Sequence, residues 1–239
     1  MSLRKTLFAA SALVGLALAA PVAQAAVIGT IPGVGVALPN KNQVMAPLTE
    51  AEGWYGTNVY LTGGPSQITA TLIGFEVGWT NRFFWGGTQT FVTTAQQLGT
   101  LGSPIGTQVV LSNVLSGLLP FVFATDGGGI PANATAGTVA NGANFMPGSG
   151  RGNFFVTFGT CPQTTCIDTT INGSTAAGGT VAWLFFDDTG GLVDDNHDDL
   201  VVRLEITGGR IVIPTPASFA LLGVGLLGLA AVARRRRAA

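Results

Sequence analysis

The residue types best suited to binding chemistry gather in one short acidic segment. Six of the twelve carboxylates of the chain lie within residues 187–199, as three Asp-Asp pairs. So dense a cluster of like charges repels itself unless a cation or solvent screens it. Oxygen donors without cysteine suit Ca²⁺. The segment therefore predicts a calcium site, with a solvated acidic turn as the alternative; the candidate ligands are Asp187, Asp188, Asp194, Asn196 and Asp198.

An EF-hand loop is the most specific form of such a site, and the sequence argues against it. Four residues stand at EF-hand ligand positions one, three, five and twelve, namely Asp194, Asn196, Asp198 and Glu205. However, Asp199 occupies the position at which the loop needs glycine. At about 3.3 Å per residue, a strand over 200–206 also places Glu205 roughly 20 Å from Asp198. A calcium site at a turn between two strands remains the prediction.

No pattern typical of nucleophilic or metal-assisted catalysis occurs in the chain. The sequence contains no G-x-S-x-G elbow, no H-E-x-x-H motif and no phosphate-binding loop. His197, the only histidine, is interpreted as a group that balances the surrounding negative charge. We therefore predict no catalytic residues and no enzyme. A glycoside hydrolase with paired carboxylates is the remaining catalytic alternative, and its candidates are Glu50, Glu52, Glu76 and Glu205.

The acidic segment lies among short stretches that the sequence predicts to be β-strands, separated by Gly, Pro and Asn. Eight of them have the alternation or the β-branched and aromatic content of strands: 54–61, 67–79, 88–93, 107–111, 119–125, 153–158, 180–186 and 200–207. The acidic segment joins the last two. The Gly- and Ala-rich stretch 126–152 predicts one extended surface loop. We therefore predict an all-β domain over residues 26–213, folded as an antiparallel jelly-roll-like sandwich.

Apolar segments at both ends of the chain indicate export and a membrane-bound stage. Arg4 and Lys5, the apolar stretch 7–20 and the sequence Ala23-Gln24-Ala25 predict a signal peptide over residues 1–25, with a retained anchor helix as the alternative. Near the C-terminus, the apolar run 217–233 would form a helix of roughly 25 Å. We predict that this helix crosses the membrane, because four arginines follow it and mark a cytoplasmic end.

The C-terminal segment 214–239 resembles the PEP-CTERM sorting signal. The matching features are Pro214-Thr215-Pro216, the Leu-, Gly- and Ala-rich helix, and the cluster Arg234, Arg235, Arg236 and Arg237; Thr215 stands where the family usually has glutamate. The resemblance implies processing by an exosortase, a membrane protease of bacteria that make exopolysaccharide. It implies an inner-membrane stage and then the cell surface or extracellular matrix, with a plain C-terminal anchor as the alternative. The acidic segment also resembles the acidic hairpins of exported bacterial β-sandwich domains of unassigned function.

Cys161 and Cys166 are the only cysteines of the chain. Export to an oxidising compartment predicts a disulfide between them. The closed loop is short, so the bond would stabilise the domain by on the order of 2 kcal/mol. The spacing does not match a C-x-x-C redox centre, and no further cysteine or histidine of a two-cysteine metal site stands nearby in the sequence.

The net charge of the middle domain limits the kinds of partner that it can bind. Residues 26–213 hold five basic and all twelve acidic residues, which leaves a net charge of −7 and argues against a nucleic-acid partner. We expect an exported structural protein of the cell surface or biofilm matrix, associated with exopolysaccharide and stabilised by calcium. The alternative is a carbohydrate-binding module whose exposed aromatic residues stack on sugars. The candidate residues for stacking, unless they belong to the core, are Trp79, Phe84 and Trp85.

Overall fold

The computed structural model describes residues 26–32, 50–76, 79–93, 102–126, 137–159, 177–189 and 197–214. Several predicted features lie outside these residues: the signal peptide, Asp194, Asn196, the pair Cys161 and Cys166, and the C-terminal segment beyond Pro214. Residues 25–215 form one compact unit. Among the described residues, no helix has the length and apolar character needed to cross a membrane.

The described residues form fifteen strands and no helix, and paired strands run antiparallel. The all-β class predicted from the sequence is confirmed. The largest sheet has seven strands in the order β1 (Val27–Pro32), β2 (Glu50–Tyr55), β11 (Asn153–Phe158), β13 (Val181–Asp187), β14 (Leu200–Thr207), β4 (Ser66–Gly74) and β7 (Gln108–Val114). A four-stranded sheet has the order β10 (Gly137–Ala140), β9 (Phe121–Thr125), β5 (Asn81–Trp85) and β6 (Thr88–Val92). A third sheet consists of short strands in the order β12 (Gly178–Gly179), β15 (Arg210–Val212), β3 (Tyr60–Thr62) and β8 (Gly117–Leu118).

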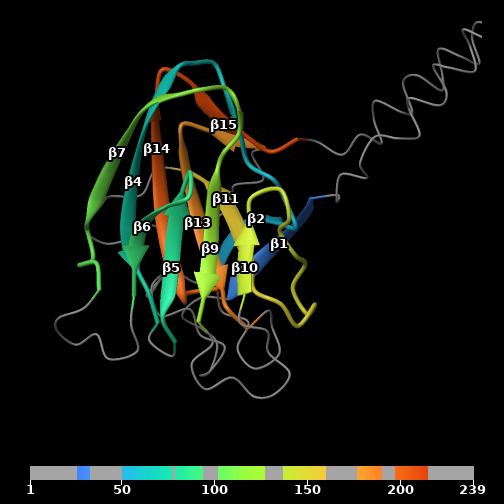
Figure 1. Cartoon of the computed structure of the whole chain (residues 1–239). Coiled ribbons are helices and arrows are strands. Elements are labelled where there is room, and N and C mark those ends of the chain that lie inside the picture. Colours follow the sequence, from blue (N-terminus) through green and yellow to red (C-terminus); the bar gives the residue numbers. More distant parts are fainter. Residues whose placement is uncertain are drawn as a thin grey trace, which may run out of the picture. The chain divides into compact units, whose positions relative to one another are not determined.

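The first two sheets face each other and enclose the main core (Figure 1). Alternation along β9 shows how each strand contributes one face: Phe121 and Phe123 are buried, whereas Val122 is partly exposed. Phe123 stacks on Phe186 of β13 with the ring centroids 4.8 Å apart, which joins the two sheets. The result is a sandwich-like arrangement.

The central strands of the seven-stranded sheet are buried on both faces. All side chains of β13 from position 182 to position 187 are buried. Leu184 and Phe186 belong to the core between the sheets, whereas Trp183 and Phe185 belong to a second apolar cluster on the opposite face. The continuous apolar sequence of β13 therefore reflects burial on two sides, which is more typical of parallel sheets than of an antiparallel one.

The predicted extended loop over 126–152 is wrong for residues 137–140. β10 lies within this stretch, pairs with β9 and buries Val139. Gly- and Ala-rich sequence has low intrinsic preference for strands, but pairing and burial outweigh that preference here. The predicted stretch 54–61 likewise separates into β2 and β3, and β1, β5 and β15 are strands that the sequence pattern did not predict.

Candidate metal site

Three carboxylates meet where β13 ends and β14 begins. Asp187, Asp188 and Asp199 each place an oxygen within 4.8 Å of the others. The pairing of β13 with β14 explains why: Phe186 lies opposite Leu200, so the next position brings Asp187 opposite Asp199. Strand register, and not spacing along the chain, builds this cluster.

Hydrogen bonds hold each of the three carboxylates in place. Thr189 donates to Asp187 Oδ1 from its backbone N–H at 2.8 Å and from its hydroxyl at 3.0 Å. The backbone N–H of Asp188 donates to Asp199 Oδ2 at 2.7 Å. Asn81, the first residue of β5, donates from Nδ2 to Asp188 Oδ2 at 2.9 Å. The cluster is therefore attached to both main sheets of the domain.

Burial makes this arrangement costly when all three groups are ionised. Asp187 and Asp188 are buried and Asp199 is half-buried. Burial, followed by repulsion from Asp188 and Asp187, raises the pKa of Asp199 well above its ordinary value of 3.8. The N–H of Asp188 opposes this increase and the charge of Asp198 adds to it. The site favours a positive charge, supplied by a proton or by a cation.

The amide group that contacts Asp188 also carries a buried oxygen. The Asn81 side chain is fully buried, and its Oδ1 has no hydrogen-bond partner among the described residues. This oxygen belongs to the same amide whose nitrogen contacts Asp188. Amide and carboxylate oxygens are the ligand types that Ca²⁺ prefers. A buried carbonyl oxygen without a partner is costly, and coordination to a cation removes that cost.

The residues before Asp199 anchor the acidic segment. His197 is fully buried, its Nε2 lies 2.7 Å from Asn153 Oδ1, and its ring packs edge-on against Tyr55 at 5.3 Å. The backbone of His197 has a φ of 58°, in the left-handed region that histidine tolerates better than most residues. The carbonyl of buried Asp198 accepts a hydrogen bond from the N–H of Glu76 at 2.8 Å. These contacts fix the direction from which the chain enters β14.

The structure brings together part of the ligand set that the sequence predicted. Asp187 and Asp188 lie in the cluster, and Asp198 is buried next to it without belonging to the group of three. Asp199 and Asn81 were not among the site residues predicted from the sequence. For Asp199, the pairing of the two flanking strands was a signal that could have placed it opposite Asp187. Glu205 lies on the extended strand β14, as predicted, and this placement excludes an EF-hand loop. Its side chain forms an ion pair with Arg203 at 2.6 Å.

The candidate stacking residues do not form one surface. Trp79, Phe84 and Trp85 are each half-buried. Trp85 packs against the core and stacks on Phe121 with the centroids 6.5 Å apart. Phe84, the neighbouring residue of β5, points to the opposite side of the sheet. Phe84 and Trp85 therefore cannot contact one sugar together.

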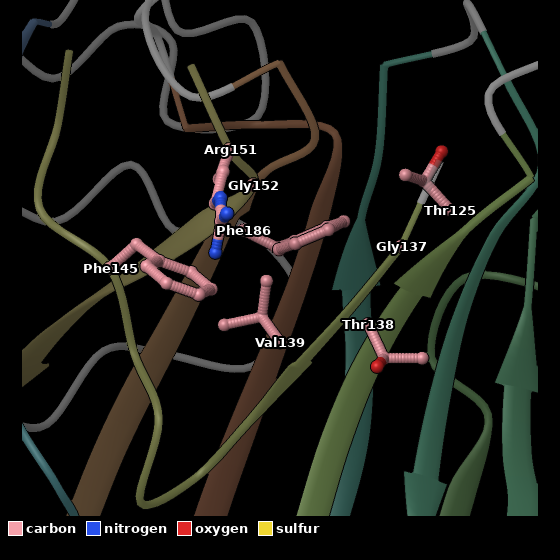
Figure 2. Close-up of a pocket in the computed structure, with 8 residues that line it drawn as sticks. All are labelled: Thr125, Gly137, Thr138, Val139, Phe145, Arg151, Gly152 and Phe186. Atoms are coloured by element: carbon pink, nitrogen blue, oxygen red, sulfur yellow. The ribbon is translucent and has the colours of Figure 1, made fainter. Parts of the chain in front are cut away.

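A separate pocket lies near the same end of the domain (Figure 2). Its volume is about 250 Å³, and Val139 and Phe186 form its apolar part. Arg151 lies over the ring of Phe145 at 4.9 Å on one side, and two threonine hydroxyl groups lie across from it in Figure 2. The Arg151 side chain forms no ion pair with any residue that the structure describes.

Comparison with known proteins assigns no family to this arrangement. No protein-family model, curated protein or solved structure matches the chain. The described residues offer a group of three carboxylates close enough together to share one cation, and a pocket that presents one guanidinium group.

Proposed function

We propose that the chain is an exported structural protein of the bacterial cell surface or extracellular matrix, associated with exopolysaccharide. In this proposal a jelly-roll-like sandwich, stabilised by calcium, lies between the signal peptide and the sorting signal. The observation that carries the calcium part of the proposal is the group of buried Asp187 and Asp188 with half-buried Asp199, together with the buried, unpartnered oxygen of Asn81. The export and sorting parts rest on the terminal sequences.

Calcium stabilises such a domain because it binds only the folded state. The unfolded chain cannot bring Asn81 to Asp188, which lie 107 residues apart in sequence. Extracellular calcium sites have Kd values of about 10⁻⁴–10⁻³ M. At about 10 mM Ca²⁺, a site in this range adds roughly 1.4–2.7 kcal/mol to the free energy of unfolding. The domain would then be more stable in a calcium-containing medium outside the cell than in a chelating one.

Thermal unfolding of the full chain in mild detergent tests the calcium site. We expect the melting temperature in about 10 mM Ca²⁺ to exceed that in chelator by about 3–10 °C. The double variant Asp188→Asn with Asp199→Asn should lose this difference. The matched control is Asp126→Asn, which changes an exposed aspartate paired with Arg82 and should keep it. Equal melting temperatures of the parent chain in calcium and in chelator would contradict the site.

Sugar binding is a second candidate function, favoured by the pocket at Arg151. The ring of Phe145 holds the guanidinium plane and leaves its N–H edges available for one carboxylate. The pocket is smaller than the usual range of about 300–1,000 Å³, so we propose a single ring that carries a carboxylate, such as a uronic acid unit. The attraction between the Arg151 guanidinium and a sugar carboxylate acts over a short distance, so it is compatible with the net negative charge of the whole domain.

Calorimetric titration with uronate and with matched neutral oligosaccharides tests this second candidate. We expect heat of binding only for the uronate series, lost in Arg151→Gln. Arg210→Gln, which removes another exposed arginine, is the control and should leave binding unchanged. Equal binding of both sugar series, or of none, would rule out this function for the pocket.

A further inference from the structure

β7 is an edge strand whose outer side is open. It is the last strand of the seven-stranded sheet, and only β4 pairs with it among the described strands (Figure 1). Val110, in the middle of β7, is 55% exposed. Ile105 and Leu115, on either side of the strand, are 64% and 73% exposed. This edge therefore combines free backbone groups with exposed apolar side chains.

The features that normally protect an edge strand are absent from β7. Natural edges carry charged residues, proline or bulges that prevent pairing with another chain. No charged residue occurs from position 83 to position 125, although the domain has a net charge of −7. A register shift between Leu111 and Val114, with Asn113 at a φ of 57°, marks a bulge at residues 112–113 near the end of the strand. Residues 108–111 pair with β4 in regular register.

Two of the other edge strands of the main sheets, β1 and β6, are less suited to pairing. β1 ends in Pro32, which has no backbone N–H to donate. β6 is partly covered, because Ser103 donates from its N–H to the carbonyl of Val92 at 2.8 Å. The Ser103 hydroxyl also accepts a bond from the N–H of Val92 at 3.2 Å.

Backbone alternation determines which groups of β7 face outward. The carbonyl of Thr107 accepts a hydrogen bond from the N–H of Leu72, so the groups of Thr107 face β4. In an antiparallel ladder the facing residues alternate. The N–H and C=O groups of Gln108 and Val110, and the N–H of Ser112, therefore point away from β4.

We propose that β7 pairs antiparallel with β7 of a second copy of this chain, across a two-fold axis at Val110. Val110 then lies opposite Val110 of the other copy, and Gln108 lies opposite Ser112. About four backbone hydrogen bonds result: the Val110 pair exchanges two, and the N–H of each Ser112 donates to the carbonyl of Gln108 in the other copy. The two seven-stranded sheets join into one continuous sheet, in the manner of β-strand addition.

A second copy fits this edge better than a charged partner for two reasons. The outward carbonyl of Gln108 and the outward N–H of Ser112 stand two residues on either side of Val110, so the edge is complementary to itself about that residue. The absence of charge lets two acidic domains approach here without the repulsion expected elsewhere on their surfaces. The inference extends the structural role proposed above to self-association, and it depends neither on calcium nor on sorting.

Disulfide trapping in the full exported chain tests the pairing. Opposed residues that exchange hydrogen bonds have Cα atoms about 5.5 Å apart, which permits a disulfide. Val110→Cys should therefore give a reducible covalent dimer under mild oxidation. The parent chain controls for Cys161 and Cys166. The matched control Thr88→Cys, an exposed position on the edge strand β6, should stay monomeric. Equal dimer yields from Val110→Cys and Thr88→Cys would overturn the proposal.

A non-covalent measurement completes the test. Sedimentation velocity of the parent chain in mild detergent should show a concentration-dependent dimer. Val110→Lys places two like charges together at the axis and should shift the dimer to monomer. Because the Val110 side chain is already exposed, this variant should not change the melting temperature of the domain itself. A parent chain that is monomeric at every concentration, or a dimer that survives Val110→Lys, overturns the proposal. The first result would mean that another segment of the same chain covers β7.

Discussion

At Asp199 two opposing influences act on a single carboxyl group. The N–H of Asp188 favours the charged form, while burial and the carboxylates of Asp188, Asp187 and Asp198 oppose it. The sequence could predict the acidic character of this site and the participation of Asp187 and Asp188. Asp199 was missed because EF-hand spacing counts residues along a loop, whereas the pairing of the two flanking strands decides which side chains meet. Asn81 comes from a distant strand and has no local signal at all.

The raised pKa of Asp199 predicts how stability depends on pH when no divalent cation is present. The folded state retains a proton that the unfolded chain releases, so the free energy of unfolding falls as pH rises. The fall begins near the ordinary pKa of 3.8 and is complete above the raised pKa of the folded state. Denaturant titrations of the full chain between pH 4 and pH 8, with chelator, should show this fall. Asp199→Asn should reduce it.

The control for this pH dependence is Glu205→Gln, which removes a carboxylate that is paired with Arg203 on the same strand, β14. This variant should keep the decrease in stability that the parent chain shows. Parallel curves for the parent chain and Asp199→Asn would show that Asp199 does not hold the proton.

At the scale of elements, the stretch after β10 contains buried asparagines whose role the composition of the sequence does not indicate. The sequence is rich in Gly, Ala and Asn and was predicted to be loop, yet Asn141 and Asn144 act in place of strand partners. Asn141 accepts from the N–H of Val59 at 2.8 Å and donates to the carbonyls of Val59 and Leu119. Asn144 makes a similar pair of bonds with the backbone of Phe154. Only the assembled fold shows which asparagines are buried.

Loss of the Asn141 side chain is expected to destabilise the domain. Asn141→Ala leaves the N–H of Val59 without its side-chain acceptor and two carbonyls without a donor, in a buried place. Unsatisfied buried groups of this kind predict a loss of about 2–4 kcal/mol in the free energy of unfolding. Thr138→Ala, an exposed change on β10, should cost less than about 0.5 kcal/mol. Denaturant unfolding measures both, and equal stability of the two variants would contradict the role of Asn141.

At the scale of the whole molecule, the class of fold was predictable and the strand order was not. Alternation and abundant Gly indicate many short strands, as β9 and β14 illustrate. The order of the sheet depends on pairing between distant segments, such as Val202 of β14 with Leu72 of β4. Residues buried on both faces, such as those of β13, carry no alternation from which a register could be inferred. Long-range packing decides these features.

Sorting provides the last prediction, and it concerns the chain as a whole. If the C-terminal segment is a sorting signal, deletion of residues 217–239 should remove the membrane-bound stage, because the apolar run and its four arginines are lost together. The shortened chain should be exported as a soluble protein that is neither processed nor retained at the surface. Thr215→Glu, which restores the usual residue of the PEP-CTERM tripeptide, should speed processing.

Cell fractionation and the mass of the mature chain measure this outcome. Gly223→Ala is the matched control, because it changes the apolar run without interrupting it and should leave sorting intact. Unchanged processing and surface retention after the deletion would show that the signal lies elsewhere. Retention without any processing of the parent chain would instead identify the segment as a plain anchor, since an anchor needs the apolar helix and the arginines but not the tripeptide at Thr215.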